Sequence, residues 1–386
     1  MRRGSVPGRQ TAKNPFSYTS SANLDRTGWA LTERRADGGK SAKIWEYAAR
    51  RILFMIPVLF GVLAITFLIS HLVPADPVGA YLGKQANNQE LRQLVIERYH
   101  FDEPIYVQFG YYLVDIFQGD LGYSLVERRD VSDIIVEKLP ATLELVTVAL
   151  LIAIPMGIYL GVISATKRNK ASDVVSRLVA LLGISVPTFF LALSLQVILA
   201  TKLGLFPIGG RYPVELDPPG GGSGFYLLNS LLALDLVAFL TSLYYVMLPG
   251  FALGFSMVGY ILRMTRSSML EVMSSDYVRA ARAKGVPEKT VINKHALRNA
   301  MGPTLTVVGL TVGGAITYTV FVEEIFNWPG IGQVAVKWTT EPDFAGIMGF
   351  TILVTVAFLV ANLAVDLLYV YFDPQVRLGG KGTHGG

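Results

Sequence analysis

Six long apolar segments constrain the fold of this chain more than any other feature. Each has about 20 or more residues and few or no charges, which is the length that a helix needs to cross the hydrocarbon of a bilayer. They run approximately over Ile52–Val73, Pro140–Ala165, Leu178–Thr201, Tyr244–Leu262, Pro303–Val322 and Phe344–Phe372. Only 16% of the residues are charged, against about 25% in soluble proteins. The sequence therefore predicts an all-α polytopic membrane protein with six transmembrane helices.

The distribution of charge between these segments predicts their orientation. Basic residues follow the second segment at Lys167, Arg168, Lys170 and Arg177, and the loop 263–302 holds eight basic against three acidic residues. The loop 74–139 is acidic, with six basic against eleven acidic residues, and the loop 323–343 holds four acidic residues against Lys337. Because basic loops face the cytoplasm, both termini are predicted to be cytoplasmic. A further apolar stretch, Leu227–Leu243, is short and contains Asp235, so we expect it to lie at the outer surface or to be re-entrant.

The remaining sequence divides the chain into three parts. Residues 1–40 are predicted to be a disordered basic cytoplasmic arm, because residues 1–51 carry eleven basic and four acidic side chains. Residues 41–378 form the transmembrane domain, which includes the outer loop 74–139 and the cytoplasmic loop 263–302. Residues 379–386 are a glycine-rich, flexible tail. The first apolar segment lies too deep and is too long for a cleavable signal peptide.

Residues that could carry chemistry are few. The chain has no cysteine, and its four histidines form no pair with metal-ligand spacing. Gly39-Lys40-Ser41 resembles the end of a phosphate-binding loop, but Arg34 stands where that loop requires glycine. The segment Gly330–Ala335 has the spacing of a dinucleotide fingerprint without its strand–helix context. The sequence therefore predicts no catalytic site, metal or cofactor in this chain, and no nucleic-acid partner.

Two acidic residues fall inside the apolar segments. Glu144 lies one turn after Pro140, and Asp366 lies near the inner end of the last segment. Intramembrane charge often marks a translocation path, but both residues can reach an interface or a neighbouring helix. We favour a structural role and keep the translocation role as the alternative. The scarcity of such groups argues that transport energy enters from elsewhere.

The loop 263–302 has the composition of helices rather than of a connector. Met269–Lys284 contains no proline or glycine, and Leu270, Met273, Tyr277 and Ala281 fall on one helical face. Gly285 fits the left-handed position after a helix, and Pro287 fits the first turn of a second helix over Pro287–Ala300. A surface of small residues surrounded by basic residues would bind either anionic lipid headgroups or a soluble partner.

At this loop the chain resembles the permeases of ATP-binding-cassette (ABC) importers. Arg279-Ala280-Ala281-x-x-x-Gly285 is similar to the family signature Glu-Ala-Ala-x-x-x-Gly, with arginine in place of glutamate. The longer string Asp276–Ala300 is similar to the version in dipeptide and oligopeptide permeases. Four further strings resemble the same family: His71–Pro77, Gly119–Ser124, Phe326–Gln333 and Val365–Arg377. The resemblance covers about residues 45–378.

The resemblance implies a permease fold and a division of labour among subunits. The chain would pair with a homologous second permease in a bacterial or archaeal cell membrane, and an extracytoplasmic solute-binding protein would deliver the solute. Two cytoplasmic ATPase subunits would hold ATP and Mg²⁺, so this chain would hydrolyse nothing itself. Its coupling helix would contact an ATPase through Asp276, Tyr277, Arg279, Ala280, Ala281, Arg282, Lys284 and Gly285.

Other functions remain open at this point. An ion-coupled secondary transporter is the main alternative, and a membrane enzyme would need a polar cluster that the sequence lacks. The acidic loop 74–139 suits a platform for the binding protein or a cap that seals the pore. The sequence identifies neither the pore-lining residues nor the solute, which in this family can be a peptide, a nickel complex, haem or an oligosaccharide.

Overall fold

The computed structural model describes residues 34–72, 76–341 and 343–372. The chain divides into two compact units, Met1–Glu46 and Tyr47–Gly386, and the second contains every feature discussed below. Most of the predicted arm at residues 1–40 and all of the predicted tail at residues 379–386 lie outside the described residues. The first described helix begins at Arg34, within the range predicted for the arm.

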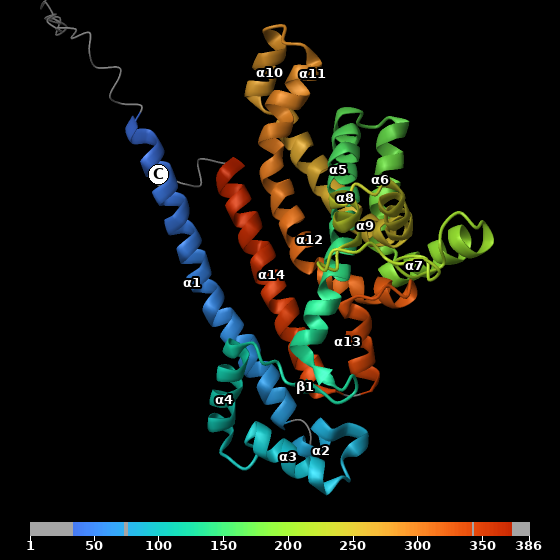
Figure 1. The fold of residues 1–386 in the computed structure, drawn as a ribbon. Coiled ribbons are helices and arrows are strands. Elements are labelled where there is room, and N and C mark those ends of the chain that lie inside the picture. The colour runs from blue at the N-terminus through green and yellow to red at the C-terminus, as the bar shows by residue number, and fades with distance from the viewer. Residues whose placement is uncertain (1–33, 73–75, 342, 373–386) are drawn as a thin grey trace, which may run out of the picture. The chain divides into compact units, whose positions relative to one another are not determined.

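The described residues are almost entirely helical (Figure 1). Before the first long internal helix the elements are α1 (Arg34–Leu72), α2 (Pro77–Leu82), the 3-10 turn η1 (Gly83–Gln85), α3 (Gln89–Tyr99), α4 (Ile105–Gln118), β1 (Tyr123–Ser124) and β2 (Arg129–Asp130). They continue with α5 (Val131–Thr166), α6 (Ala171–Ser185), α7 (Thr188–Leu195), the π-helix η2 (Gln196–Lys202), α8 (Tyr226–Leu232) and α9 (Leu236–Met273). The last are α10 (Asp276–Ala283), α11 (Glu288–Thr290), the π-helix η3 (Val291–Leu297), α12 (Arg298–Ile325), α13 (Ile331–Thr340) and α14 (Phe344–Phe372).

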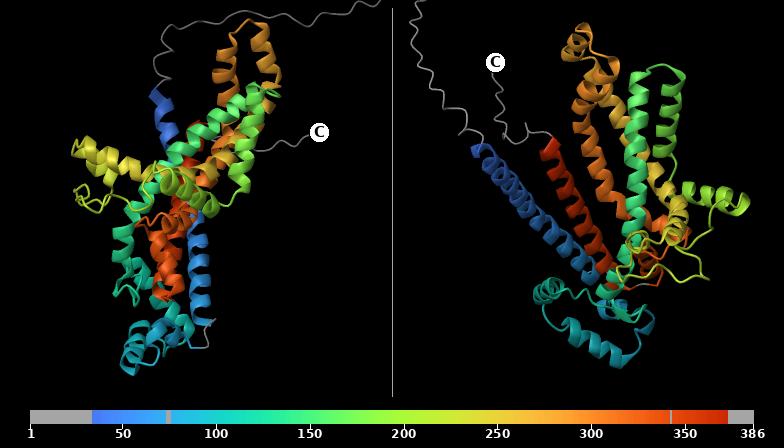
Figure 2. Two further views of the ribbon diagram at one scale, coloured as in Figure 1. Left: turned by 90° about the vertical axis from the view of Figure 1, so that its right-hand side faces the viewer. Right: turned by 45° about the horizontal axis from the view of Figure 1, so that its top comes forward.

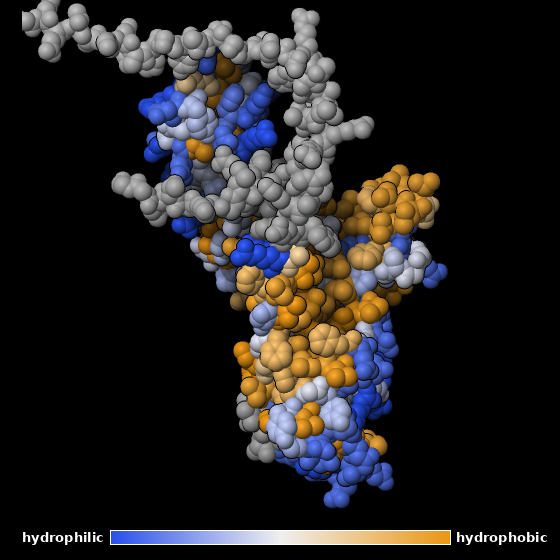
Figure 3. All heavy atoms as spheres, turned by 90° about the vertical axis from the view of Figure 1, so that its left-hand side faces the viewer, coloured by the Kyte–Doolittle hydropathy of each residue, from blue (hydrophilic) through white to orange (hydrophobic). Residues whose placement is uncertain are grey.

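Five helical stretches in the described part of the chain are long and apolar enough to cross a membrane. They are Ala48–His71, Val131–Thr166, Leu236–Met273, Glu288–Ile325 and Phe344–Leu367. A sixth candidate is the pair Ala171–Ser185 and Thr188–Lys202, whose axes differ by 108°. An apolar band separates two hydrophilic ends on the face drawn in Figure 3. The fold is therefore that of a helical membrane protein with five or six candidate spans.

The prediction of one continuous helix over Leu178–Thr201 is wrong. The helix α6 ends at Ser185, and Val186 takes the extended conformation that a residue before proline prefers. Pro187 then precedes the first residue of α7. The stretch Leu227–Leu243 is not one element: its first part belongs to α8 and its second part to the long helix α9, which Asp235 caps through the Ala238 N–H at 2.9 Å.

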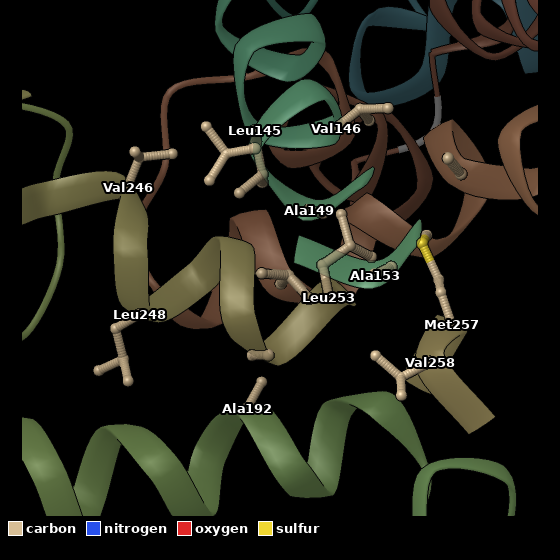
Figure 4. Close-up of a cluster of buried hydrophobic side chains, with 14 of the residues drawn as sticks. Leu145, Val146, Ala149, Ala153, Ala192, Val246, Leu248, Leu253, Met257 and Val258 are labelled. Carbon is tan, nitrogen blue, oxygen red and sulfur yellow. The ribbon is translucent and has the colours of Figure 1, made fainter. Parts of the chain in front are cut away.

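The core is the packing of α5 against α9, with α7 beside them. Leu145 and Ala149 of α5 and Leu253 and Val258 of α9 are fully buried in one cluster (Figure 4). The two backbones approach closely because Gly254 has no side chain. A β-carbon there would lie 2.7 Å from the carbonyl oxygen of Ala149. Small residues at helix contacts are typical of membrane bundles, in which close packing replaces the hydrophobic effect.

The acidic loop 74–139 is a folded cap that contains α2, α3, α4 and the β1–β2 hairpin. Val78, Leu82 and Val95 form its own small core, and α5 begins inside it, at Val131. Ser124 fastens the hairpin to α14, because its hydroxyl donates to Asp343 Oδ2 at 2.7 Å. The string Gly119–Ser124, noted for its resemblance, is thus part of this attachment. Figure 2 shows the cap at the end of the bundle opposite α10 and α11.

The string Phe326–Gln333 joins α12 to α13 and has a steric explanation. The Glu323 carboxylate accepts hydrogen bonds from the N–H groups of Gly332 (2.7 Å) and Gln333 (3.2 Å). A β-carbon at Gly330 would fall 2.4 Å from that carboxyl group. Trp328 Nε1 donates to the Ala141 carbonyl at 2.9 Å and ties the turn to α5. The glycines of this string therefore make room for the Glu323 carboxylate.

Both predicted intramembrane carboxylates lie in ion pairs. Glu144 pairs with Arg211, and Asp366 pairs with Arg51 at 2.9 Å. An ion pair is what a structural role for each of these two carboxylates predicts. The sequence predicted only these two acidic residues inside the apolar segments. It missed Glu323, which is fully buried and lies within the span Glu288–Ile325. The predicted span ended one residue too early, at Val322, to include it.

Candidate coupling hairpin and transport cleft

The predicted cytoplasmic loop forms a helical hairpin, α10–turn–α11, that lies at one end of the molecule (Figure 1). The prediction of one helix over Met269–Lys284 is wrong, because α9 ends at Met273 and α10 begins at Asp276. The hydroxyls of Ser274 and Ser275 donate to the carbonyls three residues before them, at 2.7 and 2.6 Å. Such bonds compete with helical ones and interrupt the helix.

The second predicted helix also has different limits. Pro287 precedes the first helical residue, Glu288, and helical backbone continues past Ala300 to Ile325. A π-helical stretch, η3, lies within it. The hairpin is therefore attached directly to a candidate membrane span, with no flexible link between them.

The helix α10 is anchored by two side chains. Val278 is fully buried, where α10 packs against η3 and the end of α9. The Tyr277 hydroxyl accepts a hydrogen bond from Asn299 Nδ2 at 3.0 Å. Sequence reasoning missed Val278 and Asn299, and the apolar face that it assigned to Tyr277 and Ala281 omitted the buried residue. The spacing of Val278 from Met273 would not have revealed it, because the helix is interrupted between them.

Gly285 occupies the left-handed position that the sequence predicted, with φ of 77°. Its N–H donates to the Arg282 carbonyl at 3.0 Å, and the Val286 N–H donates to the Ala281 carbonyl at 3.3 Å. This pair of bonds is a Schellman motif, which satisfies the last carbonyls of a helix and requires glycine or asparagine at that position. The turn of the hairpin is therefore set by its backbone.

The charged residues of α10 are partly engaged within the hairpin. Arg282 donates to both carboxylate oxygens of Glu288, at 3.1 and 2.8 Å, and braces the two arms. Arg279 pairs with Asp276 on the same helix. The exposed basic side chains of this end that form no ion pair within the described residues are Lys284, Lys289, Lys294 and Arg298. The family's glutamate at the position of Arg279 would reverse that charge, so the local charge pattern differs from the family signature.

The small residues of the hairpin leave an open surface. Ala280 and Gly285 are exposed, and Ala281 is half-buried. A β-carbon at Gly285 would meet no atom within 4 Å. A partner could therefore approach the α10 backbone closely. The structure brings all eight predicted residues onto one short hairpin.

A second feature is an apolar cleft where the bent pair α6–α7 meets α9 and α12. Its volume is about 440 Å³, and its walls include Pro187, Thr188, Tyr260, Thr311 and Tyr318. No charged side chain lines it within the described part of the chain. Sequence reasoning could not name these residues, although Pro187, which interrupts an apolar segment, was the available signal.

Metal chemistry has no site in the residues described. Among residues 34–72, 76–341 and 343–372, no group of three or more histidine, aspartate or glutamate side chains could hold a metal ion.

Candidate membrane spans therefore surround an uncharged cleft, and a hairpin braced by Arg282 and Glu288 lies beyond them. The chain belongs to the family described as binding-protein-dependent transport system inner membrane components, whose model matches residues 153–378. The model of the N-terminal part of these components matches residues 44–146.

Curated relatives agree with this family. The chain is 40% identical over 336 residues to a probable D,D-dipeptide transport system permease of Escherichia coli, covering 87% of this chain and 98% of that protein. It is 42% identical over 331 residues to a dipeptide transport system permease of Alkalihalophilus pseudofirmus, covering 86% and 99%. A glutathione transport system permease of Escherichia coli is 35% identical over 331 residues, covering 86% and 98%.

This chain is therefore a permease subunit of an ABC-type importer and a multi-pass protein of the inner membrane. The same findings exclude the ion-coupled secondary transporter that the sequence alone had left open.

Proposed function

We propose that this permease translocates dipeptides or peptides of similar size and receives its energy through the α10 hairpin. The observation that carries the proposal is the exposed small-residue surface of Ala280 and Gly285 on a hairpin that continues into a membrane span. The solute class follows the names of the relatives, which are permeases for dipeptides, D,D-dipeptides and glutathione.

The energy source is a pair of cytoplasmic ATPase subunits that bind ATP and Mg²⁺. One ATPase seats α10 in a cleft, where Ala280, Ala281 and Gly285 permit close backbone contact. The exposed lysines and arginines nearby complement an acidic rim, which steers association and fixes its orientation. The other predicted coupling residues shape the hairpin and the edge of its contact surface: Asp276, Tyr277, Arg279, Arg282 and Lys284.

The membrane arrangement is six crossings with both termini in the cytoplasm. The bent pair α6–α7 supplies the sixth crossing. The basic loop 263–302 and the loop after α5 then lie on the cytoplasmic side, and the acidic cap lies outside, as the positive-inside bias requires. The extracytoplasmic binding protein docks on that cap and releases its solute toward the membrane.

A second, homologous permease completes the pathway. The cleft beside α7 and α12 is flanked by exposed aromatic side chains, Phe189 (46%), Tyr318 (51%) and Phe321 (58%). A surface of this kind next to an uncharged cleft suits one half of a channel whose other half comes from a partner. The lining holds no fixed charge that would bind one terminus of a zwitterionic peptide and hold it in the pathway.

Transport follows from rigid-body movement. When the ATPases close on ATP, they move the two coupling hairpins, and the attached helices switch the pathway between inward-facing and outward-facing forms. This chain contributes positioning and a path for the solute, and the ATPases contribute the hydrolysis.

The decisive experiment places a bulky residue on the hairpin surface. Ala280→Tyr changes an exposed position and should leave the permease folded, but it should abolish ATPase co-purification and uptake of labelled dipeptide. The matched control is Ala171→Tyr, which makes the same change at the exposed first residue of α6 and should retain most activity. Normal ATPase association and uptake in Ala280→Tyr would refute the assignment of the coupling surface.

The solute class needs a separate measurement. Uptake of dipeptides, glutathione and a charged metal complex by the intact transporter would be compared in proteoliposomes with ATP inside. Preference for the metal complex would overturn the peptide assignment and leave the coupling assignment intact.

A further inference from the structure

A small pocket lies between the cap and the outer ends of two spans. Phe67 and His71 of the last turns of α1 contribute to its wall, as do Ala345 and Met348 of the first turns of α14. The candidate spans are Ala48–His71 and Phe344–Leu367, so both end or begin at this wall. The pocket therefore lies at the depth where hydrocarbon gives way to lipid headgroups.

Aromatic rings form most of the remaining wall. Phe67 and Tyr112 have ring centroids 5.4 Å apart, and Tyr81 lies 4.5 Å from Tyr99 and 6.2 Å from Phe101. These rings all belong to residues that line the pocket, so an occupant would contact aromatic surface. The faces of aromatic rings attract cations, and quaternary or primary ammonium groups are the ligands that aromatic cages recognise.

Two buried polar atoms in the wall have no hydrogen-bond partner among the described residues. They are the Tyr112 hydroxyl and Gln108 Oε1. The amide of Gln108 is held in place because its Nε2 donates to the Glu103 carbonyl at 2.7 Å. Unsatisfied buried polar atoms are unfavourable, and here both can accept a hydrogen bond from an N–H group.

Among the charged side chains of the pocket wall, carboxylates outnumber cations by one. Arg98 pairs with Asp120 at 3.3 Å, and Asp115 forms no salt bridge within the described part of the chain. Burial and the neighbouring Asp120 raise the pKa of Asp115 above its ordinary value. A cationic occupant would offset both effects, because an opposite charge favours the ionised carboxyl group.

The pocket has room for a small group and lies beside a lipid-facing helix. Its volume is about 170 Å³, close to that of an engineered cavity of about 150 Å³ that binds benzene. An aromatic side chain of α4 contacts α1: the Phe109 ring centroid lies 5.6 Å from that of Phe60 and 5.1 Å from that of Phe67. The other face of α4 exposes apolar side chains, among them Phe117 at 82%, so the leaflet reaches the pocket's edge.

We propose that this pocket binds an organic ammonium group, supplied by the headgroup of an aminophospholipid of the adjacent leaflet. The aromatic rings surround the ammonium, and Asp115, Gln108 and the Tyr112 hydroxyl accept its hydrogen bonds. Arg98 at the edge is placed to meet the phosphate of the same headgroup. A bound headgroup would fix the cap to the membrane surface.

The experiment is native mass spectrometry of the intact transporter purified from membranes that contain phosphatidylethanolamine and phosphatidylglycerol. The wild type should retain phosphatidylethanolamine in preference. Asp115→Asn should lower that retention about tenfold, as the loss of one charge contact predicts. Tyr112→Phe keeps the ring and should lower it about threefold. Asp102→Asn, which changes an exposed carboxylate of the same cap, should behave as the wild type.

Two outcomes would overturn the proposal. Equal retention of the two lipids by the wild type would exclude an ammonium site, as would undiminished phosphatidylethanolamine in both Asp115→Asn and Tyr112→Phe. A titration with ethanolamine in detergent distinguishes the sources. Displacement of the lipid by ethanolamine, lost in Asp115→Asn, would assign the site to free amines, whereas binding of the diacyl lipid alone would assign it to the headgroup.

Discussion

Breaking the ion pair between Glu144 and Arg211 should destabilise the permease far more than breaking any surface pair. Glu144 is 5% exposed and Arg211 is 8% exposed. Arg211 Nε donates to Glu144 Oε2 at 2.9 Å, and Arg211 Nη2 donates to the Gly224 carbonyl at 2.8 Å. The guanidinium also lies 3.8 Å from the ring centroid of Tyr226. One side chain therefore fixes the segment before α8 to α5.

The magnitude follows from the burial. Arg211→Met leaves the carboxylate with the hydrogen bond that it accepts from the Leu227 N–H at 2.6 Å. Removing one partner of a buried pair costs about 3–5 kcal/mol, so the free energy of unfolding should fall by that amount. Glu144→Gln should cost somewhat less, because the amide oxygen still accepts a hydrogen bond. The double variant should cost clearly less than the sum of the two losses, with an interaction energy of about 2–3 kcal/mol.

The assay is unfolding of the purified permease by sodium dodecyl sulfate in mixed micelles, followed by tryptophan fluorescence. Trp328 is a local reporter, since its ring centroid lies 5.7 Å from the Arg211 guanidinium. The control is Lys337→Met, which removes a surface pair with Glu127 and should cost less than about 1 kcal/mol. Single losses no larger than the control, or strict additivity, would refute the reasoning.

Three further outcomes follow from the structure. Gly285→Ala should lower the free energy of unfolding by about 1–2 kcal/mol, because φ of 77° is unfavourable for residues with a β-carbon. Gly285→Asn should lower it less. Thermal unfolding of the complex measures both. Gly254→Val should prevent recovery of monodisperse protein by size-exclusion chromatography, whereas Gly220→Val, where a β-carbon meets nothing within 4 Å, should not. The hydrogen bond from Arg92 lowers the pKa of Asp76, so the pair stabilises the cap above the ordinary value near 3.8. That contribution is lost as the pH falls through the lowered pKa, and Arg92→Gln should abolish this part of the pH dependence of hydrogen exchange in α3.

Hydropathy was enough to predict five of the candidate spans, because a run of about 20 apolar residues has few places to fold outside a membrane. It could not distinguish a straight span from a bent one. The segment Leu178–Thr201 is uniformly apolar on both sides of Pro187, so the bend of 108° is invisible to any average over the segment. Only the backbone requirements of proline, applied at that single residue, indicate the break.

Local stereochemistry was predictable where one residue type is required. Gly285 was identified because a positive φ needs glycine, and the Schellman bonds have the expected form. The break at Ser274 and Ser275 was missed, because their side-chain bonds outweigh the helix-forming residues around them. Partners distant in sequence were also missed: 67 residues separate Glu144 from Arg211, and nothing in either local sequence specifies the other.

The helical stretch Glu288–Ile325 has a mechanical consequence. Its 38 residues correspond to roughly 55 Å, longer than the whole bilayer of about 40–45 Å. One end carries the Arg282–Glu288 brace, and the other ends two residues after Glu323, the carboxylate that holds the start of α13. If the hairpin is the coupling element proposed above, we expect a displacement there to move the turn at Trp328 as well, because both ends belong to the same helical stretch.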